Sequence, residues 1–265
     1  MKPVVIAHRG ARSLAPENTL AAARKAYALG ADLWETDVGV SKDGFLILMH
    51  DDSLERTTDA PTRFPEAAPW IFTTFELKAL RTLDAGSWFY ETDPFGEVAA
   101  GHVLEDHRGE RVPTVEEALR LTQELGWRVN LELKRQPPPM DTFPILESTL
   151  EEIRAIGLGP DAVVLSSFDL DLMRKARRLA PEFRVQAVLG FHRDRPIDWD
   201  SARDFDELNP RAALTPPEKV RALAQAGKRV YPWTVNDPEE ALRYFDAGAA
   251  GVFTDYLQRI IPLLR

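Results

Sequence analysis

Three carboxylates lie in strand-like segments, with the types and spacing of oxygen ligands for a hard cation. Glu35 and Asp37 stand two residues apart in the segment Leu33–Val40, and such positions on a strand project to the same face. Glu132 and Lys134 repeat this geometry further along the chain. Two close carboxylates repel each other unless a cation lies between them or one is protonated. A lone Glu-x-Asp pattern is equally typical of a solvated strand face, but the third acid favours a site for Mg²⁺, Ca²⁺ or Mn²⁺.

Two of the five histidines lie at the ends of apolar runs. His8 ends the first run, and His50, followed by Asp51, ends a later one. Histidine titrates near neutral pH and transfers protons, Arg9 can fork two hydrogen bonds to a phosphate, and Gly10 lets the backbone come close. By itself a His-Arg-Gly motif is more typical of a structural histidine. Beside a metal site, however, two histidines supply the acid and the base that phosphodiester hydrolysis needs.

Two further polar or aromatic features have both structural and functional interpretations. The run Pro16-Glu17-Asn18-Thr19 is typical of a helix start, with Asn18 or Thr19 near the cap, although Glu17 could also orient Arg9. Trp233 stands near the end of a late strand-like segment, where an aromatic wall for a substrate and a packed core tryptophan are equally plausible.

The elements that would position these residues alternate between strand-like and helix-like patterns. Such alternation predicts a parallel sheet, and about eight strand–helix units fit a closed α/β barrel better than an open sheet. In a barrel of this kind the carboxyl ends of the strands converge on one pocket. The expected strands are Val4–His8, Leu33–Val40, Arg128–Lys134, Ala162–Phe168, Arg184–Leu189, Phe205–Asn209, Arg229–Val235 and Gly251–Thr254, and the expected helices are Asn18–Leu29, Phe75–Arg81, Val115–Leu125, Ile145–Ile156, Asp171–Leu179, Pro217–Ala226, Glu239–Ala247 and Leu257–Leu264.

Two segments are additions to this barrel plan. Phe45–His50 follows a Ser-Lys-Asp-Gly turn signal and is expected to return as a hairpin strand. The segment from Leu83 to Pro113 is rich in aromatic residues and glycine and predicts a small loop-rich insertion, after the second βα region, which includes His102 and His107. We expect a single domain over residues 1–265, because no linker interrupts the alternation.

Composition excludes several classes of protein. The formal net charge of −9 over 265 residues argues against a nucleic-acid binder and against stable association with an anionic membrane. The chain has no cysteine, which excludes disulfides and thiolate chemistry, and its apolar run at the start is too short for a signal peptide. We therefore expect a cytoplasmic enzyme for a small-molecule substrate.

Taken together, the motifs closely resemble those of the glycerophosphodiester phosphodiesterase family. The resemblance implies a (β/α)₈ TIM barrel and metal-dependent hydrolysis of glycerophosphodiesters, such as glycerophosphocholine or glycerophosphoethanolamine, to an alcohol and sn-glycerol 3-phosphate. The motifs run in order along nearly the whole chain: His8-Arg9-Gly10, Pro16-Glu17-Asn18-Thr19-Leu20, Gly30-Ala31-Asp32, Trp34-Glu35-Thr36-Asp37-Val38, Lys42-Asp43-Gly44, His50-Asp51, Glu132-Leu133-Lys134, Ser167-Phe168, Trp233-Thr234-Val235-Asn236 and Thr254-Asp255.

The same resemblance implies a role for each site residue and none for His102, His107 or His192. The matching positions are His8 and His50 for the catalytic pair, Arg9 and Lys134 for the phosphate, Trp233 for the glycerol moiety, and Glu35, Asp37 and Glu132 for the divalent cation. Apart from the resemblance, we expect Glu17 and Asp51 to support the site.

The expected mechanism has two proton transfers. One histidine takes a proton from the nucleophile, and the other, for which His50 is the candidate, protonates the leaving alcohol. The nucleophile is water or the glycerol 2-hydroxyl, and the residues do not choose between them. A lysophospholipase D acting on lysophospholipids and a non-catalytic phosphodiester-binding barrel are the alternatives. The headgroup, the identity and number of the ions and the oligomeric state stay open.

Overall fold

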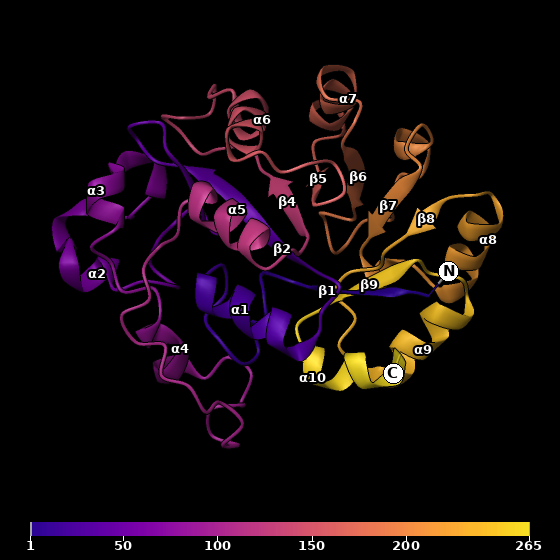
Figure 1. Cartoon of the computed structure of the whole chain (residues 1–265), viewed down its shortest axis with the longest axis horizontal. Coiled ribbons are helices and arrows are strands. Elements are labelled where there is room, and N and C mark those ends of the chain that lie inside the picture. The colour runs from indigo at the N-terminus through magenta and orange to yellow at the C-terminus, as the bar shows by residue number, and fades with distance from the viewer. Residues whose placement is uncertain (1, 265) are drawn as a thin grey trace.

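The computed structural model describes residues 2–264 and shows a barrel of parallel strands surrounded by helices (Figure 1). The sheet runs in the order β8-β7-β6-β5-β4-β2-β1-β9, and every neighbouring pair on this path is parallel. This confirms the predicted TIM barrel. The barrel strands are β1 (Val4–Ala7), β2 (Leu33–Val40), β4 (Val129–Leu133), β5 (Val163–Ser167), β6 (Arg184–Leu189), β7 (Glu207–Pro210), β8 (Arg229–Val230) and β9 (Gly251–Thr254).

Backbone hydrogen bonds complete the ring between β8 and β9. The Ala250 amide donates to the Val230 carbonyl at 2.9 Å, and the Phe253 amide donates to Pro232 at 3.0 Å. The Val235 amide in turn donates to Phe253 at 2.8 Å. Because the ring is complete, the carboxyl ends of all the strands face one shared opening.

The register of two central strands brings the predicted acids together. β2 and β4 are parallel neighbours, and Asp37 lies directly opposite Glu132 across their ladder. Every residue of β2 is buried, because the strand has the barrel interior on one face and helices on the other. Acidic side chains held at such a position need a partner charge or a cation.

The barrel contains both an apolar cluster and buried polar side chains. Ile6, Leu33, Val164, Tyr231 and Phe253 form a buried apolar cluster of their own. Buried polar side chains form a hydrogen-bonded network beside this cluster, although Asn209 Oδ1 has no partner among residues 2–264. The bonds of the network run from Asn130 to Gln186 at 2.8 Å, from Asn209 to Gln186 at 2.8 Å and from Ser166 to Asn130 at 2.6 Å.

Helices cover the outside of the barrel, and several of them begin at capping side chains. Thr19 caps α1 by accepting a bond from the Ala22 amide, and Thr114 and Glu117 form a reciprocal capping box at α5. The covering helices are α1 (Leu20–Leu29), α5 (Val115–Glu124), α6 (Ile145–Ile156), α7 (Leu170–Leu179), α8 (Pro217–Gln225), α9 (Pro238–Asp246) and α10 (Leu257–Ile260). The link between β6 and β7 contains only the 3₁₀ helix Asp200–Ala202.

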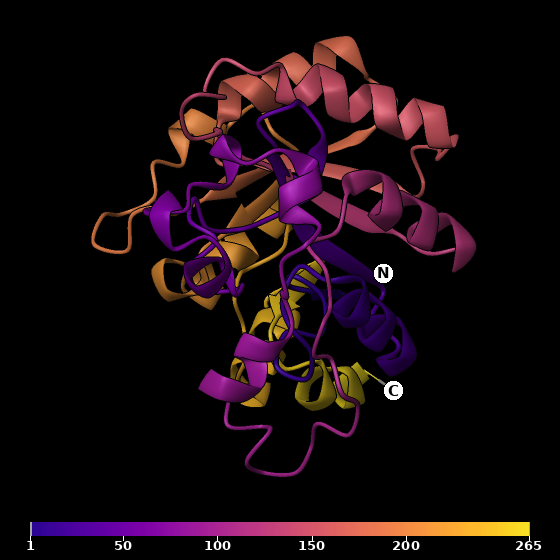
Figure 2. The same ribbon diagram turned by 90° about the vertical axis from the view of Figure 1, so that its left-hand side faces the viewer.

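The predicted hairpin is confirmed, and the excursion that follows it is longer than the expected insertion. β3 (Leu46–Leu48) pairs antiparallel with β2, and only short helices lie between β3 and α5. The helix expected over Phe75–Arg81 is a single turn. These helices gather at one side of the barrel (Figures 1 and 2), over a separate apolar cluster that includes Ile47 and Phe72. They are α2 (Ala60–Arg63), α3 (Leu77–Leu80) and α4 (Ser87–Thr92), with the 3₁₀ helices Pro65–Ala67 and Phe72–Thr74.

Candidate active site

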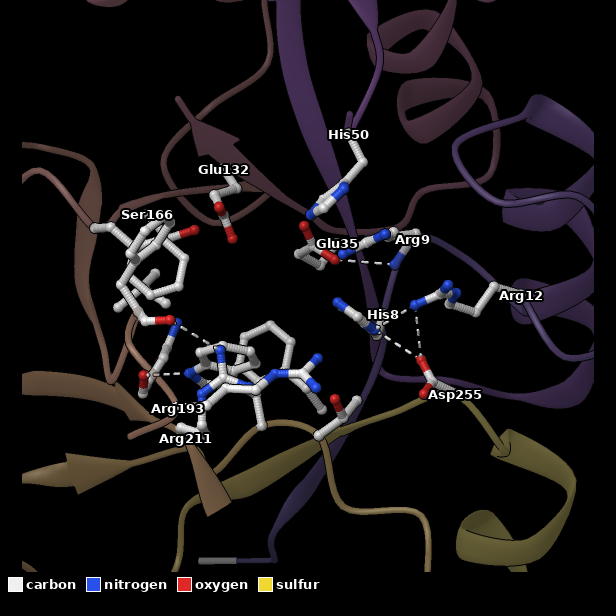
Figure 3. A pocket seen from close by; sticks show the side chains of 17 residues that line it. His8, Arg9, Arg12, Glu35, His50, Glu132, Ser166, Arg193, Arg211 and Asp255 are labelled. Carbon is white, nitrogen blue, oxygen red and sulfur yellow. Dashed lines mark hydrogen bonds and ion pairs between the residues drawn. The ribbon is translucent and has the colours of Figure 1, made fainter. Parts of the chain in front are cut away.

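A cavity of about 390 Å³ opens at the carboxyl ends of the barrel strands. His8, His50 and Glu132 direct their polar ends toward the same central space (Figure 3). The residues that line the cavity come from nearly every strand or the loop after it: His8, Arg9, Arg12, Glu35, His50, Glu132, Ser166, Phe168, Val188, Phe191, Arg193, Asn209, Arg211, Trp233, Thr234, Phe253 and Asp255.

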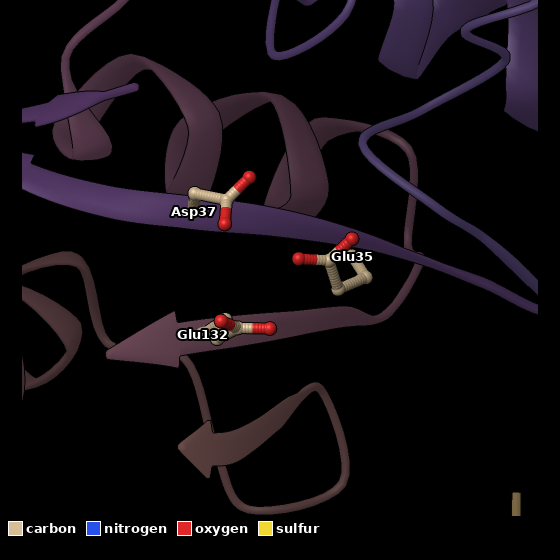
Figure 4. A group of neighbouring side chains, drawn as sticks. All are labelled: Glu35, Asp37 and Glu132. Atoms are coloured by element: carbon tan, nitrogen blue, oxygen red, sulfur yellow. The ribbon is translucent and has the colours of Figure 1, made fainter. Parts of the chain in front are cut away.

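The three predicted acidic ligands form one cluster at this opening (Figure 4). One carboxylate oxygen from each of Glu35, Asp37 and Glu132 lies within 4.8 Å of the others. Burial, and then the charges of Asp37 and Glu132, raise the pKa of Glu35 well above its usual range, and burial and Asp37 also raise the pKa of Glu132. A divalent cation would relieve this repulsion, and three carboxylates are the donor set that hard cations prefer. The residues therefore fit such a cation.

Asp37 is held by groups on three other segments. Its Oδ2 accepts a hydrogen bond from Asn18 Nδ2 at 2.9 Å, and its Oδ1 lies 3.6 Å from Lys134 Nζ. Burial alone would raise the pKa of Asp37, but His50, Lys134 and Arg9 together hold it below its usual range. Asn18 is therefore not the helix cap, which is Thr19, but a support for a predicted ligand.

Arg9 connects the cluster to the start of α1. Its backbone amide donates to Glu35 Oε2 at 2.9 Å, and its Nη1 donates to Glu17 Oε1 at 2.8 Å. Arg9 Nε is buried and has no hydrogen-bond partner among residues 2–264, although Asp37 Oδ2 lies 3.4 Å away. Next to it, a Cβ on Gly10 would lie 2.6 Å from that of Ala22, so the glycine is needed for packing against α1.

Glu17 is buried among three arginines. Its Oε1 accepts from Arg9 and from Arg56 Nη2 at 2.7 Å, and its Oε2 accepts from Arg12 Nη2 at 2.6 Å and Arg56 Nη1 at 3.1 Å. Burial alone would raise its pKa, but Arg9, Arg12 and Arg56 hold the pKa of Glu17 well below its usual range. The carboxylate thus fixes the guanidinium of Arg9 beside the acidic cluster.

His8 is oriented by a carboxylate from the loop after the last strand. Its Nδ1 lies 2.7 Å from Asp255 Oδ1, and Asn236 Nδ2 donates to the other oxygen of Asp255 at 2.9 Å. Arg12 Nη1 lies 3.5 Å from the same Asp255 oxygen. Burial and the charge of Arg9 lower the pKa of His8, so the neutral imidazole is favoured near pH 7.

His50 has a similar arrangement on the other side of the cavity. Its Nδ1 contacts Asp51 Oδ1, and Arg56 Nε donates to the second oxygen of that carboxylate at 2.6 Å. The ammonium of Lys134 donates to the backbone carbonyl of His50 and also lies beside Asp37. Both histidines therefore have Nδ1 occupied by a carboxylate, and Nε2 is the nitrogen left for a substrate.

Part of the cavity wall is aromatic. Trp233 Nε1 donates to the Asn209 carbonyl at 2.9 Å, which fixes the indole within the cavity wall. The ring of Phe168 meets the indole edge-on at 5.5 Å, and the ring of Phe191 meets Phe168 at 5.2 Å. This aromatic part of the wall also carries Arg211, whose guanidinium lies 4.1 Å from the centre of the Trp233 ring.

Comparison with known proteins identifies this arrangement. The sequence matches the glycerophosphoryl diester phosphodiesterase family over residues 8–259. The chain belongs to this family. The glycerophosphodiester phosphodiesterase of Caldanaerobacter subterraneus subsp. tengcongensis is 32% identical over all of this chain and 99% of the relative, and that of Bacillus subtilis is 31% identical over 96% and 83%. A phosphodiesterase of Oleispira antarctica, solved in complex with the product sn-glycerol-3-phosphate, is 29% identical, with a TM-score of 0.79 over 98% of this chain and 96% of that one.

These findings confirm the predicted glycerophosphodiester phosphodiesterase family and enzyme class. Eight of the ten residues predicted for the site line the cavity, belong to the acidic cluster or contact that cluster directly. The other two, Glu17 and Asp51, contact Arg9 and His50 from behind. The three remaining histidines of the sequence are not among the cavity-lining residues.

Three supporting residues were not predicted for the site, although one of them, Asp255, stands in a motif that carries the resemblance. Asp255 follows the last strand, and the same rule that pointed to the other strand ends would have found it. Arg12 carries only the weak signal of a second arginine close to His8. Arg56 lies in an irregular segment after β3, where no periodic pattern shows that it turns back toward Glu17.

Proposed function

We propose that the chain hydrolyses glycerophosphodiesters, such as glycerophosphocholine and glycerophosphoethanolamine, to an alcohol and sn-glycerol 3-phosphate with the help of a divalent cation. The main support is one observation: His8 and His50 border the same cavity as two acids of a cluster suited to a cation. The product held by the Oleispira antarctica phosphodiesterase supports the same substrate class.

In this proposal Glu35, Asp37 and Glu132 hold the cation, which would withdraw charge from the phosphoryl oxygens. Mg²⁺, Ca²⁺ and Mn²⁺ all accept three carboxylate ligands. Arg9 and Lys134 stand at the edge of the cluster and contact the phosphate. The unpaired Nε of Arg9 supports this role, because a buried guanidinium nitrogen without a partner is costly.

The two histidines carry the proton transfers. His8 takes the proton of the nucleophile, because its lowered pKa favours the neutral ring, and Asp255 keeps Nε2 free for this task. His50, which Asp51 orients and which is more exposed, donates a proton to the leaving alcohol. Water and the glycerol 2-hydroxyl are both compatible with this assignment as nucleophile.

A lysophospholipase D activity is the second candidate, and an aromatic rim favours it. Phe191 is 66% exposed at the mouth of the cavity and contacts Phe168, so an acyl chain would find apolar surface there. None of the described helices is long and apolar enough to cross a membrane. The sn-glycerol-3-phosphate held by the Oleispira antarctica phosphodiesterase supports the water-soluble glycerophosphodiesters, which we rank first.

A direct comparison of substrates tests the proposal. The purified chain is incubated with glycerophosphocholine or lysophosphatidylcholine, and the released choline and sn-glycerol 3-phosphate are quantified. We expect a higher kcat/KM with glycerophosphocholine, and turnover that is lost in His8→Ala. A higher kcat/KM with lysophosphatidylcholine would favour the second candidate, and no turnover of either substrate with any divalent cation would contradict both.

A further inference from the structure

Two arginines in the cavity lack the carboxylate partners that its other two arginines have. Arg9 and Arg12 both contact Glu17, and each lies within 3.5 Å of a further carboxylate. Arg193 and Arg211 line the same cavity, on the side away from Arg9 and Arg12 (Figure 3), and neither has a carboxylate within ion-pair distance among residues 2–264. In a chain whose net charge is −9, acidic groups outnumber basic ones, so two arginines without a carboxylate partner in the cavity need an explanation.

Arg211 is held in one orientation. Its Nε donates to the Gly190 carbonyl at 2.6 Å, and its guanidinium stacks over the Trp233 ring at 4.1 Å. Gly190 itself has φ 87°, and a Cβ there would lie 2.7 Å from the Cβ of Arg211. The loop after β6 is therefore shaped to admit this arginine, and Nη1 forms no hydrogen bond within the described chain.

Arg193 adds a second charge beside the first. Arg193 is exposed on the loop after β6. Burial is the larger cause of the lowered pKa of Arg211, and the positive charge of Arg193 is the second cause. Two cations that repel each other in this way are stabilised together by an anion between or beside them. The scissile phosphate has its own partners at the acidic cluster, in Arg9, Lys134 and the cation.

We propose that Arg193 and Arg211 form a subsite for a second anionic group of the substrate. The subsite favours phosphodiesters that carry another phosphate or a carboxylate beyond the Trp233 wall, and it disfavours cationic headgroups such as choline. The stacked, forked guanidinium of Arg211 suits a phosphate in particular. This inference rests on the proposed hydrolytic function and names the substrates for which the site is best suited.

The test compares two substrates that differ by one distal glycerophosphate. They are glycerophosphoglycerol and bis(glycerophospho)glycerol, whose hydrolysis is followed by ³¹P NMR with the cation-loaded enzyme. Bis(glycerophospho)glycerol has two equivalent bonds that can be cleaved, and its kcat/KM is corrected for this number. After the correction, we expect its kcat/KM to be about tenfold higher than that of glycerophosphoglycerol, as is typical of one charged contact. In Arg193→Gln and Arg211→Gln this preference should fall toward unity.

Two further variants separate charge from folding. Arg211→Lys retains the charge without the planar fork and should keep part of the preference. Arg178→Gln removes one exposed positive charge that has no ion pair among residues 2–264, and this variant should keep the whole preference.

Because Arg193 is exposed, its substitution tests the proposal even if Arg211→Gln fails to fold.

The possible failures are distinguishable. If both substrates are hydrolysed without a preference, or if Arg193→Gln slows both by the same factor, the second anion subsite is wrong while the hydrolytic function stands. If neither substrate nor glycerophosphocholine is hydrolysed with any divalent cation, the proposed function itself is wrong.

Discussion

Replacing Glu17 by glutamine should destabilise the chain more than any removal of a surface charge. Only 2% of the Glu17 side chain is exposed, and its two oxygens each accept one bond from a buried arginine and one from Arg56. A glutamine keeps one oxygen and places an NH₂ group against two guanidinium donors. Whichever way the amide points, it loses the bond from Arg9 or Arg12 together with one bond from Arg56.

The expected cost follows from these contacts. A charge-assisted bond to a buried arginine is worth about 1.5–3 kcal/mol, whereas the bond to the more exposed Arg56 adds less than about 1 kcal/mol. The arginine left uncompensated beside the acidic cluster brings the total to about 3 kcal/mol. In a chain of this size that corresponds to a fall in Tm of about 6–12 °C, measured by calorimetry.

The control is Glu182→Gln, which removes an exposed carboxylate 3.8 Å from Arg154 and should cost no more than about 1 kcal/mol. The pH dependence gives a second check. Because the folded-state pKa of Glu17 lies well below its unfolded value, its contribution is complete above about pH 4.5 and is lost as the pH falls through the folded pKa. The difference in Tm between the wild type and Glu17→Gln should therefore become smaller at acidic pH. Equal Tm values for Glu17→Gln and Glu182→Gln at pH 7 would refute the reasoning.

Three further predictions concern catalysis and the cation. His8→Ala and His50→Ala should each lower kcat about 10²–10⁴-fold, whereas His192→Ala, outside the cavity, should leave it within about twofold; wild-type kcat in either of the first two would refute the acid–base roles. Asp255→Asn should lower kcat at least about tenfold and, because Asp255 raises the pKa of His8, should move the acid limb of the kcat/KM profile to lower pH; an unmoved limb would show that His8 is not the base. A saturating divalent cation should raise the Tm of the wild type, by about 5–10 °C at 100 times its Kd, but not that of Glu132→Gln, and equal shifts would place the ion elsewhere.

Much of the barrel and the core of the site were predictable because periodic patterns locate strands and their ends. Glu35 and Asp37 were placed on one strand face by their spacing alone. Their closeness to Glu132 depends on the register between β2 and β4, which pairs residues 95 positions apart and which no local pattern specifies. The barrel topology supplied that contact in the prediction, because it makes strand ends converge.

The parts that the sequence did not predict are set by irregular backbone. Arg56 returns to the site from a segment of single-turn helices, whose path depends on the apolar cluster beneath it. The sequence left Asn18 and Thr19 both as candidates for the helix cap; Thr19 caps α1, and Asn18 instead donates to Asp37. Arg211 was not predicted, because the role that we propose for it depends on the turn at Gly190 and on stacking over Trp233.

The most direct test of the account is the dependence of hydrolysis on a cation held by the acidic cluster. Wild type and Glu132→Gln are stripped with EDTA, transferred to chelator-free buffer and assayed with glycerophosphocholine, first without metal and then with Mg²⁺, Ca²⁺ or Mn²⁺. The account predicts that stripped wild type releases no sn-glycerol 3-phosphate, that at least one of the cations restores release, and that Glu132→Gln stays inactive at the same concentration. Full activity of the stripped wild type would contradict it.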